Sequence, residues 1–75
     1  SKLEKDPKTR LQEWLQSKGE PLPQYEVTRE TGEPHNREYE VSCTIAGMDV
    51  FVGVGTGRRR AEQMAAQMAL EAIEK

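Results

Sequence analysis

Apolar residues near the start of the chain recur at the spacing i, i+3, i+4: Leu11, Trp14 and Leu15. This spacing predicts a helix with one buried stripe. Asp6 and Pro7 suit its N-cap and first position, and the glycine and two prolines within residues 19–23 end it. Polar residues follow the same spacing on the opposite side: Thr9, Gln12, Glu13 and Gln16.

From Gln24 the period changes to two, which predicts half-buried strands. The first strand has Tyr25 and Val27 on one face, with polar residues between them. A hairpin-type loop is expected over residues 31–36. The second strand has the clearest alternation in the chain, and its inward residues are Tyr39, Val41, Cys43 and Ile45.

A third strand is expected over residues 50–54, after a tight turn at residues 46–49. Its facing is left open, because three alternating valines compete with Phe51 for the core. A second helix is predicted from Arg58 to Glu74. One broad arc of it is apolar and is expected to be buried: Ala61, Ala65, Ala69, Leu70, Ala72 and Ile73. The other side is polar: Gln63, Gln67, Glu71 and Glu74.

These elements predict an α+β fold of order α-β-β-β-α, with a three-stranded antiparallel sheet and both helices packed on one face. Residues 6–75 are interpreted as one domain and residues 1–5 as a linker, and the start without Met suggests a fragment of a longer protein. Seventy-five residues leave no room for a second domain. Val41–Met48, an uncharged run as long as any in the chain, is far shorter than the ~20 apolar residues that a membrane span needs, so a cytoplasmic protein is expected.

The net charge of −2 argues at first against a nucleic-acid partner. The charges are unevenly distributed, however. Residues 11–57 carry eight acidic and three basic side chains, whereas residues 1–10 carry four basic and two acidic ones. Arg58, Arg59 and Arg60 form the densest cationic cluster, at the start of a predicted helix. Cations there oppose the helix dipole, so their placement favours a bound anion.

The sequence gives little support for a catalytic site. Glu38 and Glu40 are the only close pair of carboxylates, and they alternate onto the polar side of a strand. Cys43 is expected in the core. One His and one inward Cys cannot form a metal site, so no catalytic residue and no metal or other cofactor is expected in this chain.

The glycine-rich turn over residues 53–57 lies between a strand and a helix, where backbone N–H groups can bind an anion. It lacks the Lys and Ser/Thr of a phosphate-binding loop and the spacing of the dinucleotide fingerprint, so a nucleotide pocket is disfavoured. The glycines could equally serve close packing of the helix on the sheet, and the two uses are compatible.

Binding of single-stranded nucleic acid usually needs exposed aromatic side chains, and the few aromatic residues lie mostly at core positions. Duplex RNA is bound instead through phosphates and 2'-hydroxyls, for which Gln, Thr and Glu are suitable. The polar stripe of the first helix could serve this purpose or be an ordinary solvated face.

The order of elements and several motifs resemble the double-stranded RNA-binding domain family. The family's loop pattern Gly-x-Pro-His-x-Lys-x-Phe is met, with two conservative changes, by Gly32, Pro34, His35, Arg37 and Tyr39. Its second-helix pattern, Ser-Lys-Lys-x-Ala-Lys followed by Ala-Ala and Ala-Leu, is met by Arg58-Arg59, Ala61, Ala65-Ala66 and Ala69-Leu70. Residues 5–13 and 21–25 resemble in particular the C-terminal module of bacterial ribonuclease III.

The resemblance implies recognition of A-form RNA by shape, in three contacts along one face. Thr9, Gln12 and Glu13 would meet one minor groove, and Pro34 with His35 the next. The intervening phosphates would bind the arginine cluster, which we define as Arg58, Arg59 and Arg60.

The resemblance also implies a parent enzyme. Its Mg2+-dependent nuclease reaction in RNA processing would belong to a separate domain, and it would be a homodimer, although the fragment alone would be monomeric. Gly57 and Glu62 depart from the family pattern, where Ser and Lys are common, which predicts modest affinity and a shallow dependence on salt. A protein-interaction version of the domain with weak or no RNA binding remains the alternative.

Overall fold

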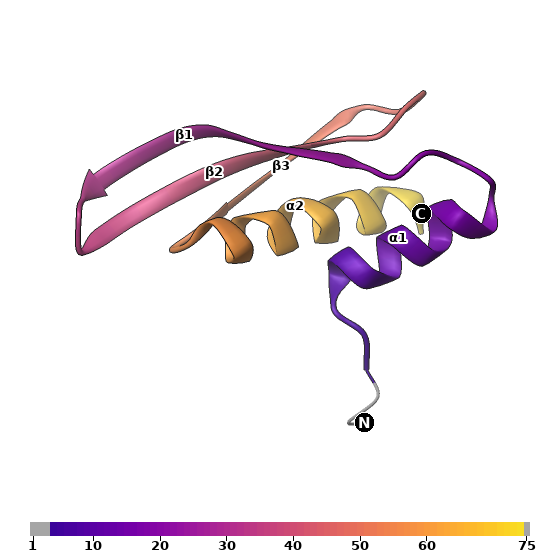
Figure 1. The fold of residues 1–75 in the computed structure, drawn as a ribbon, viewed down its shortest axis with the longest axis horizontal. Coiled ribbons are helices and arrows are strands. Elements are labelled where there is room, and N and C mark those ends of the chain that lie inside the picture. Colours follow the sequence, from indigo (N-terminus) through magenta and orange to yellow (C-terminus); the bar gives the residue numbers. More distant parts are fainter. Residues whose placement is uncertain (1–3, 75) are drawn as a thin grey trace.

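The computed structural model describes residues 4–74. Its elements follow the predicted order: α1 (Pro7–Ser17), β1 (Gln24–Glu33), β2 (Asn36–Thr44), β3 (Val50–Gly55) and α2 (Arg58–Ile73). The three strands form one antiparallel sheet of order β1-β2-β3, and both helices lie on the same side of it (Figure 1). The predicted fold class is therefore confirmed. The domain boundaries stay a prediction, and residues 1–3 and Lys75 lie outside the described residues.

The start of α1 has the predicted cap. Asp6 is extended (φ −74°, ψ 166°), and its Oδ1 accepts a hydrogen bond of 2.8 Å from the Thr9 N–H. That bond satisfies one of the backbone donors left open at a helix start, and it lowers the pKa of the Asp6 carboxyl. Leu11 and Leu15 are buried on the inner side of α1. The helix ends before Gly19, which takes a positive φ of 71°.

The hairpin between β1 and β2 is tighter than predicted. Glu33 pairs with Asn36, so only Pro34 and His35 form the turn, and the expectation of a loop over residues 31–36 is wrong in its extent. Backbone hydrogen bonds between the two strands continue through exposed polar residues. Because these residues do not alternate between apolar and polar, the sequence does not indicate that the strands extend so far. Gly32 has φ +97°, and a Cβ there would lie 2.5 Å from the Asn36 carbonyl oxygen.

The facing of β3, which the sequence left open, is decided by the approach of α2. Phe51 and Gly53 point toward the helices, and the three valines are about half exposed on the outer face: Val50, Val52 and Val54. A Cβ on Gly53 would lie 2.1 Å from the Ala65 backbone nitrogen. A valine side chain at position 53 would not fit, so β3 cannot turn its valines toward the helices.

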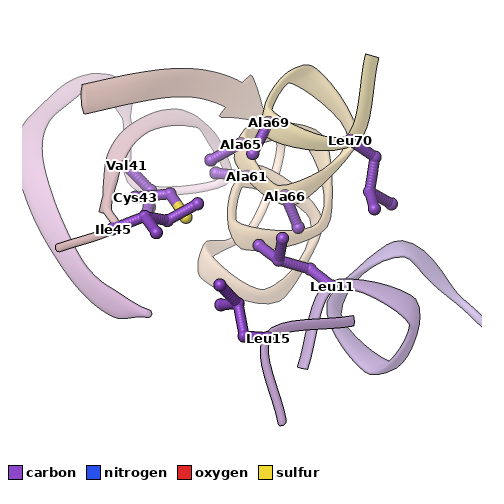
Figure 2. Packing of buried hydrophobic residues seen from close by; sticks show 10 residues of the cluster. All are labelled: Leu11, Leu15, Val41, Cys43, Ile45, Ala61, Ala65, Ala66, Ala69 and Leu70. Atoms are coloured by element: carbon purple, nitrogen blue, oxygen red, sulfur yellow. The ribbon is translucent and has the colours of Figure 1, made fainter. Parts of the chain in front are cut away.

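The core contains ten buried residues, four of them alanines of α2 (Figure 2): Leu11, Leu15, Val41, Cys43, Ile45, Ala61, Ala65, Ala66, Ala69 and Leu70. Ala66 was not predicted in the buried arc, yet it is buried and points toward Leu11 (Figure 2). Ala72, which helical spacing placed inward, is exposed, so that part of the prediction is wrong. Burial depends on what packs opposite a residue as well as on its phase along the helix.

Burial changes the pKa of two side chains in the interior, Cys43 and Tyr25. Burial raises the pKa of the Cys43 thiol, which keeps it protonated, as expected for a core cysteine. Burial also raises the pKa of Tyr25, whose hydroxyl has no hydrogen-bond partner within residues 4–74. Over the same range, no helix is long and apolar enough to cross a membrane.

Candidate nucleic-acid interface

The polar stripe of α1 is exposed as predicted. Thr9, Gln12 and Glu13 all lie on the solvent side of the helix. The backbone N–H of Thr9 is bound by the Asp6 cap, and Glu13 accepts a 2.6 Å hydrogen bond from the Lys5 ammonium. Glu13 is therefore partly neutralised, which suits a side chain that would approach a polyanion.

The arginine cluster occupies the first turn of α2, and all three of its side chains are exposed. The preceding Gly57 is extended (φ −152°, ψ 160°) and provides no side-chain cap. Its carbonyl already accepts the Ala61 N–H at 2.9 Å. The first-turn N–H groups and the positive end of the helix dipole therefore lie beside exposed guanidinium groups. Such an arrangement is suited to an anion such as phosphate.

Gln63 joins the start of α1 to α2. Its Oε1 accepts the Lys8 backbone N–H at 3.0 Å, and its Nε2 donates to Asp6 Oδ2, also at 3.0 Å. The sequence placed Gln63 on the outer polar side of the helix, but it is half buried between the two helix starts. No local pattern connects residues 57 positions apart, so sequence reasoning missed this contact.

Glu62 adds an ionic link at the same place. Its Oε1 accepts from Lys8 Nζ at 2.6 Å, and its Oε2 accepts from Arg58 Nε at 3.1 Å. Burial alone raises the pKa of Glu62, but the bonds from Lys8 and Arg58 outweigh it and hold this pKa below the usual range. Lys8 Nζ also lies 4.8 Å from the centre of the Tyr25 ring. Lys8, Glu62 and Arg58 form what we call the charge triad.

A concave site of about 680 Å³ lies between the two helix starts. Thr9 and Gln12 line it from α1, Arg58 and Arg59 from α2, and Tyr25 from β1. The structure thus brings four of the eight predicted site residues to one depression. Lys8, Glu62 and Gln63, which were not among the predicted site residues, also line it.

The hairpin tip, Pro34 and His35, is a separate exposed point of the molecule. It lies at one end of the long axis, along which the molecule measures 41 Å, and both helices run away from that end, with α2 beginning nearer to it than α1 (Figure 1). Arg37 Nη1 donates to Glu30 Oε1 at 3.1 Å across the two strands next to the tip. The predicted residues therefore form three groups: the α1 stripe, the arginine cluster and the hairpin tip.

In the part of the chain that the structure describes, no three His, Cys, Asp or Glu side chains gather into a possible metal site.

The chain and its fold match a known family. Residues 7–73 match the family model described as "Double-stranded RNA binding motif", and the chain belongs to this family. Among curated proteins it is 61% identical to Ribonuclease 3 of Vibrio vulnificus and 58% identical to Ribonuclease 3 of Vibrio cholerae, each over 71 residues. These matches cover 93% of this chain and 32% of each relative, so the chain spans about a third of their length.

Solved structures agree with this assignment. A structure of Arabidopsis HYL1, described in relation to miRNA processing, superposes with a TM-score of 0.80 at 32% identity, covering 92% of this chain and 97% of that one. A structure of both such domains of DRB4 with their linker gives 0.69 at 31% identity, over 89% and 43% of the two chains. The predicted resemblances to the family and to bacterial ribonuclease III are confirmed.

Proposed function

We propose that this chain binds double-stranded RNA and recognises its A-form shape through the three groups described above. Thr9, Gln12 and Glu13 address 2'-hydroxyls and base edges in one minor groove, and Pro34 and His35 enter the next. Arg58, Arg59 and Arg60 hold phosphates across the major groove between them, over about 16 base pairs in all. The observation that carries this proposal is the exposed arginine cluster beside the α1 stripe.

The aromatic residues support duplex over single-stranded RNA. All four of them are partly buried against the core: Trp14, Tyr25, Tyr39 and Phe51. Bases of a single strand would need exposed rings on which to stack. A duplex requires none, because its phosphates and 2'-hydroxyls are already on its surface.

A competition between duplex RNA and duplex DNA of the same sequence tests the proposal. RNA is expected to displace DNA readily, since only RNA offers 2'-hydroxyls and the A-form groove widths. Equal affinity for the two duplexes would contradict the minor-groove contacts.

For the longer protein we propose the role of substrate-binding module of a ribonuclease III, a cytoplasmic double-strand-specific endoribonuclease in RNA processing. Its Mg2+ site and its homodimer interface would lie outside this chain. The fragment with duplex RNA and Mg2+ should then give no cleavage. The full-length protein should cleave, and deleting residues 6–75 should raise its KM more than it lowers its kcat.

One observation favours the alternative, a domain whose partner is a protein. The outer sheet face exposes three valines of β3, an unusual concentration of apolar side chains on a small charged molecule. The exposed arginine cluster has no explanation in that alternative. A fragment that bound neither RNA nor DNA duplexes would favour it.

A further inference from the structure

Glu62 stands in the predicted phosphate-binding region, although its charge would repel RNA. Its side chain is only 13% exposed, and each of its oxygens accepts one cationic donor. Lys8 comes from α1, whereas Arg58 lies one helical turn before Glu62 on α2. A carboxylate held this way is built into the junction of the two helices.

The bond to Glu62 leaves the phosphate-binding part of Arg58 free. Glu62 accepts the Nε–H, which is one of the five donors of a guanidinium group. Of the remaining four, one N–H of Nη1 and one of Nη2 form the edge that bonds a phosphate with two parallel hydrogen bonds. The Arg58 side chain is still 63% exposed. Its guanidinium plane is thus oriented before a ligand arrives, which lowers the conformational entropy lost on binding.

Lys8 has a different part in the charge triad. Its ammonium bonds Glu62 and lies over the Tyr25 ring, and its side chain is 34% exposed. It links α1 to α2 and anchors the carboxylate from the side opposite Arg58.

We propose that Glu62 is a positioning residue for RNA binding, which orients the Arg58 guanidinium toward a phosphate. This inference rests on the proposed function. The inference and a simple count of charges predict opposite changes in RNA affinity when Glu62 is neutralised. If only charge matters, removing an acidic group should strengthen binding to a polyanion. If orientation matters more, neutralising Glu62 weakens binding.

The test is Glu62→Gln, which preserves shape and removes the charge. The matched control is Glu71→Gln, which makes the same charge change on the same helix, where Glu71 accepts a hydrogen bond from Gln67. With a duplex RNA longer than the proposed site, Glu62→Gln is expected to lose affinity by roughly threefold or more. Glu71→Gln should bind as tightly as the parent or slightly more tightly. Binding by Glu62→Gln that equals or exceeds that of Glu71→Gln overturns the inference.

A double-mutant cycle distinguishes positioning from general stabilisation. Arg58→Ala should cost less affinity in the Glu62→Gln background than in the parent chain, because the unaligned guanidinium has less to lose. Fully additive losses overturn the inference. If Glu62→Gln does not fold, Arg58→Lys is tested in its place. Lysine retains the positive charge but lacks the planar guanidinium that Glu62 would orient. Duplex RNA affinity of Arg58→Lys equal to that of the parent chain would overturn the inference.

The parent chain is measured first in each series. Absence of duplex RNA binding by the parent contradicts the proposed function itself. Parent binding combined with unchanged or tighter binding by Glu62→Gln contradicts only the role of Glu62.

Discussion

At Gly53 the backbone of β3 passes directly against the backbone of α2. A Cβ at this position would lie 2.1 Å from the Ala65 nitrogen and 2.5 Å from the Ala61 carbonyl oxygen. The alanines that face it bring the helix this close, and the missing side chain of the glycine completes the contact. Of the two uses that the sequence allowed for the glycine-rich turn, close packing therefore explains Gly53.

Gly53→Ala should accordingly destabilise the domain by about 3 kcal/mol, because both obstructing atoms belong to a backbone that cannot rotate away. Urea unfolding followed by circular dichroism measures this loss. Val52→Thr on the outer face of the same strand is the control, expected within about 0.5 kcal/mol of the parent. Equal stability of the two variants would contradict the close approach of α2 to β3.

At the scale of elements, the two helix starts differ in how they are capped. The start of α1 is capped by Asp6 and attached to Gln63, so its backbone donors are used within the domain. The start of α2 has a glycine cap and exposed arginines. One start is satisfied internally and the other is left available to an anion, which fits the proposed phosphate contacts of α2.

The Asp6 cap predicts a pH dependence of stability. Its carboxyl has a lower pKa in the folded chain than the ordinary value of 3.8, mainly because of the hydrogen bond from Thr9. A depressed pKa contributes stability that is fully present above the unfolded value and is lost as pH falls through the folded one. The melting temperature should therefore fall as pH decreases below about 4.

Asp6→Asn separates this group from the other carboxylates. Asparagine is also a good N-cap but does not titrate, so the variant should melt close to the parent in its acid limb and show a shallower dependence on pH. Melting curves between pH 7 and pH 2 provide the comparison. An acid limb equally steep in both proteins would exclude Asp6 as a contributor.

At the scale of the whole molecule, the arginine cluster lies apart from the outer sheet face with its apolar and acidic residues. The start of α2 carries the arginine cluster, and both helices run away from the end that bears the hairpin tip (Figure 1). The outer sheet face carries acidic and polar residues on β1 and β2 and the three valines on the edge strand β3. A net charge of −2 is therefore compatible with a cationic site, because the acidic residues are concentrated elsewhere in the chain.

The arginine cluster predicts how RNA binding depends on salt. The double change Arg58→Ala, Arg59→Ala should weaken duplex RNA binding and reduce the slope of log K against log salt by roughly one to two, as expected for two lost phosphate contacts. Titrations at several salt concentrations measure this slope. Arg29→Ala, on β1 outside the three groups, should leave it unchanged. An unaltered slope in the double variant would contradict the phosphate contacts.

The distance of the hairpin tip from the helices predicts a dependence on duplex length. His35→Ala should weaken binding to duplexes longer than about 16 base pairs, which offer both minor grooves. Duplexes of roughly half that length offer the α1 stripe only one groove, and the variant should bind them like the parent. A loss independent of length would place His35 in a different contact.

The sequence by itself determined the order of the elements, the Asp6 cap, the inward faces of β1 and β2, and the residues that mark the family. These features depend on backbone chemistry and on side-chain alternation within a few neighbouring residues, which the chain states directly. The three groups of candidate RNA-binding residues follow from the family resemblance, and the structure leaves all eight residues exposed.

Only the tertiary structure decided the facing of β3, the two-residue hairpin turn, the exposure of Ala72 and the charge triad. The facing of β3 and the triad depend on what packs opposite a residue from another part of the chain: Ala65 against Gly53, or Lys8 against Glu62 across 54 positions. The hairpin turn depends instead on strand pairing through exposed polar residues. Hydrophobic periodicity and secondary-structure propensity describe one helix or strand at a time, so they cannot specify a contact between two such elements. The triad changes the interpretation of Glu62, from a missing cation to the group that orients Arg58.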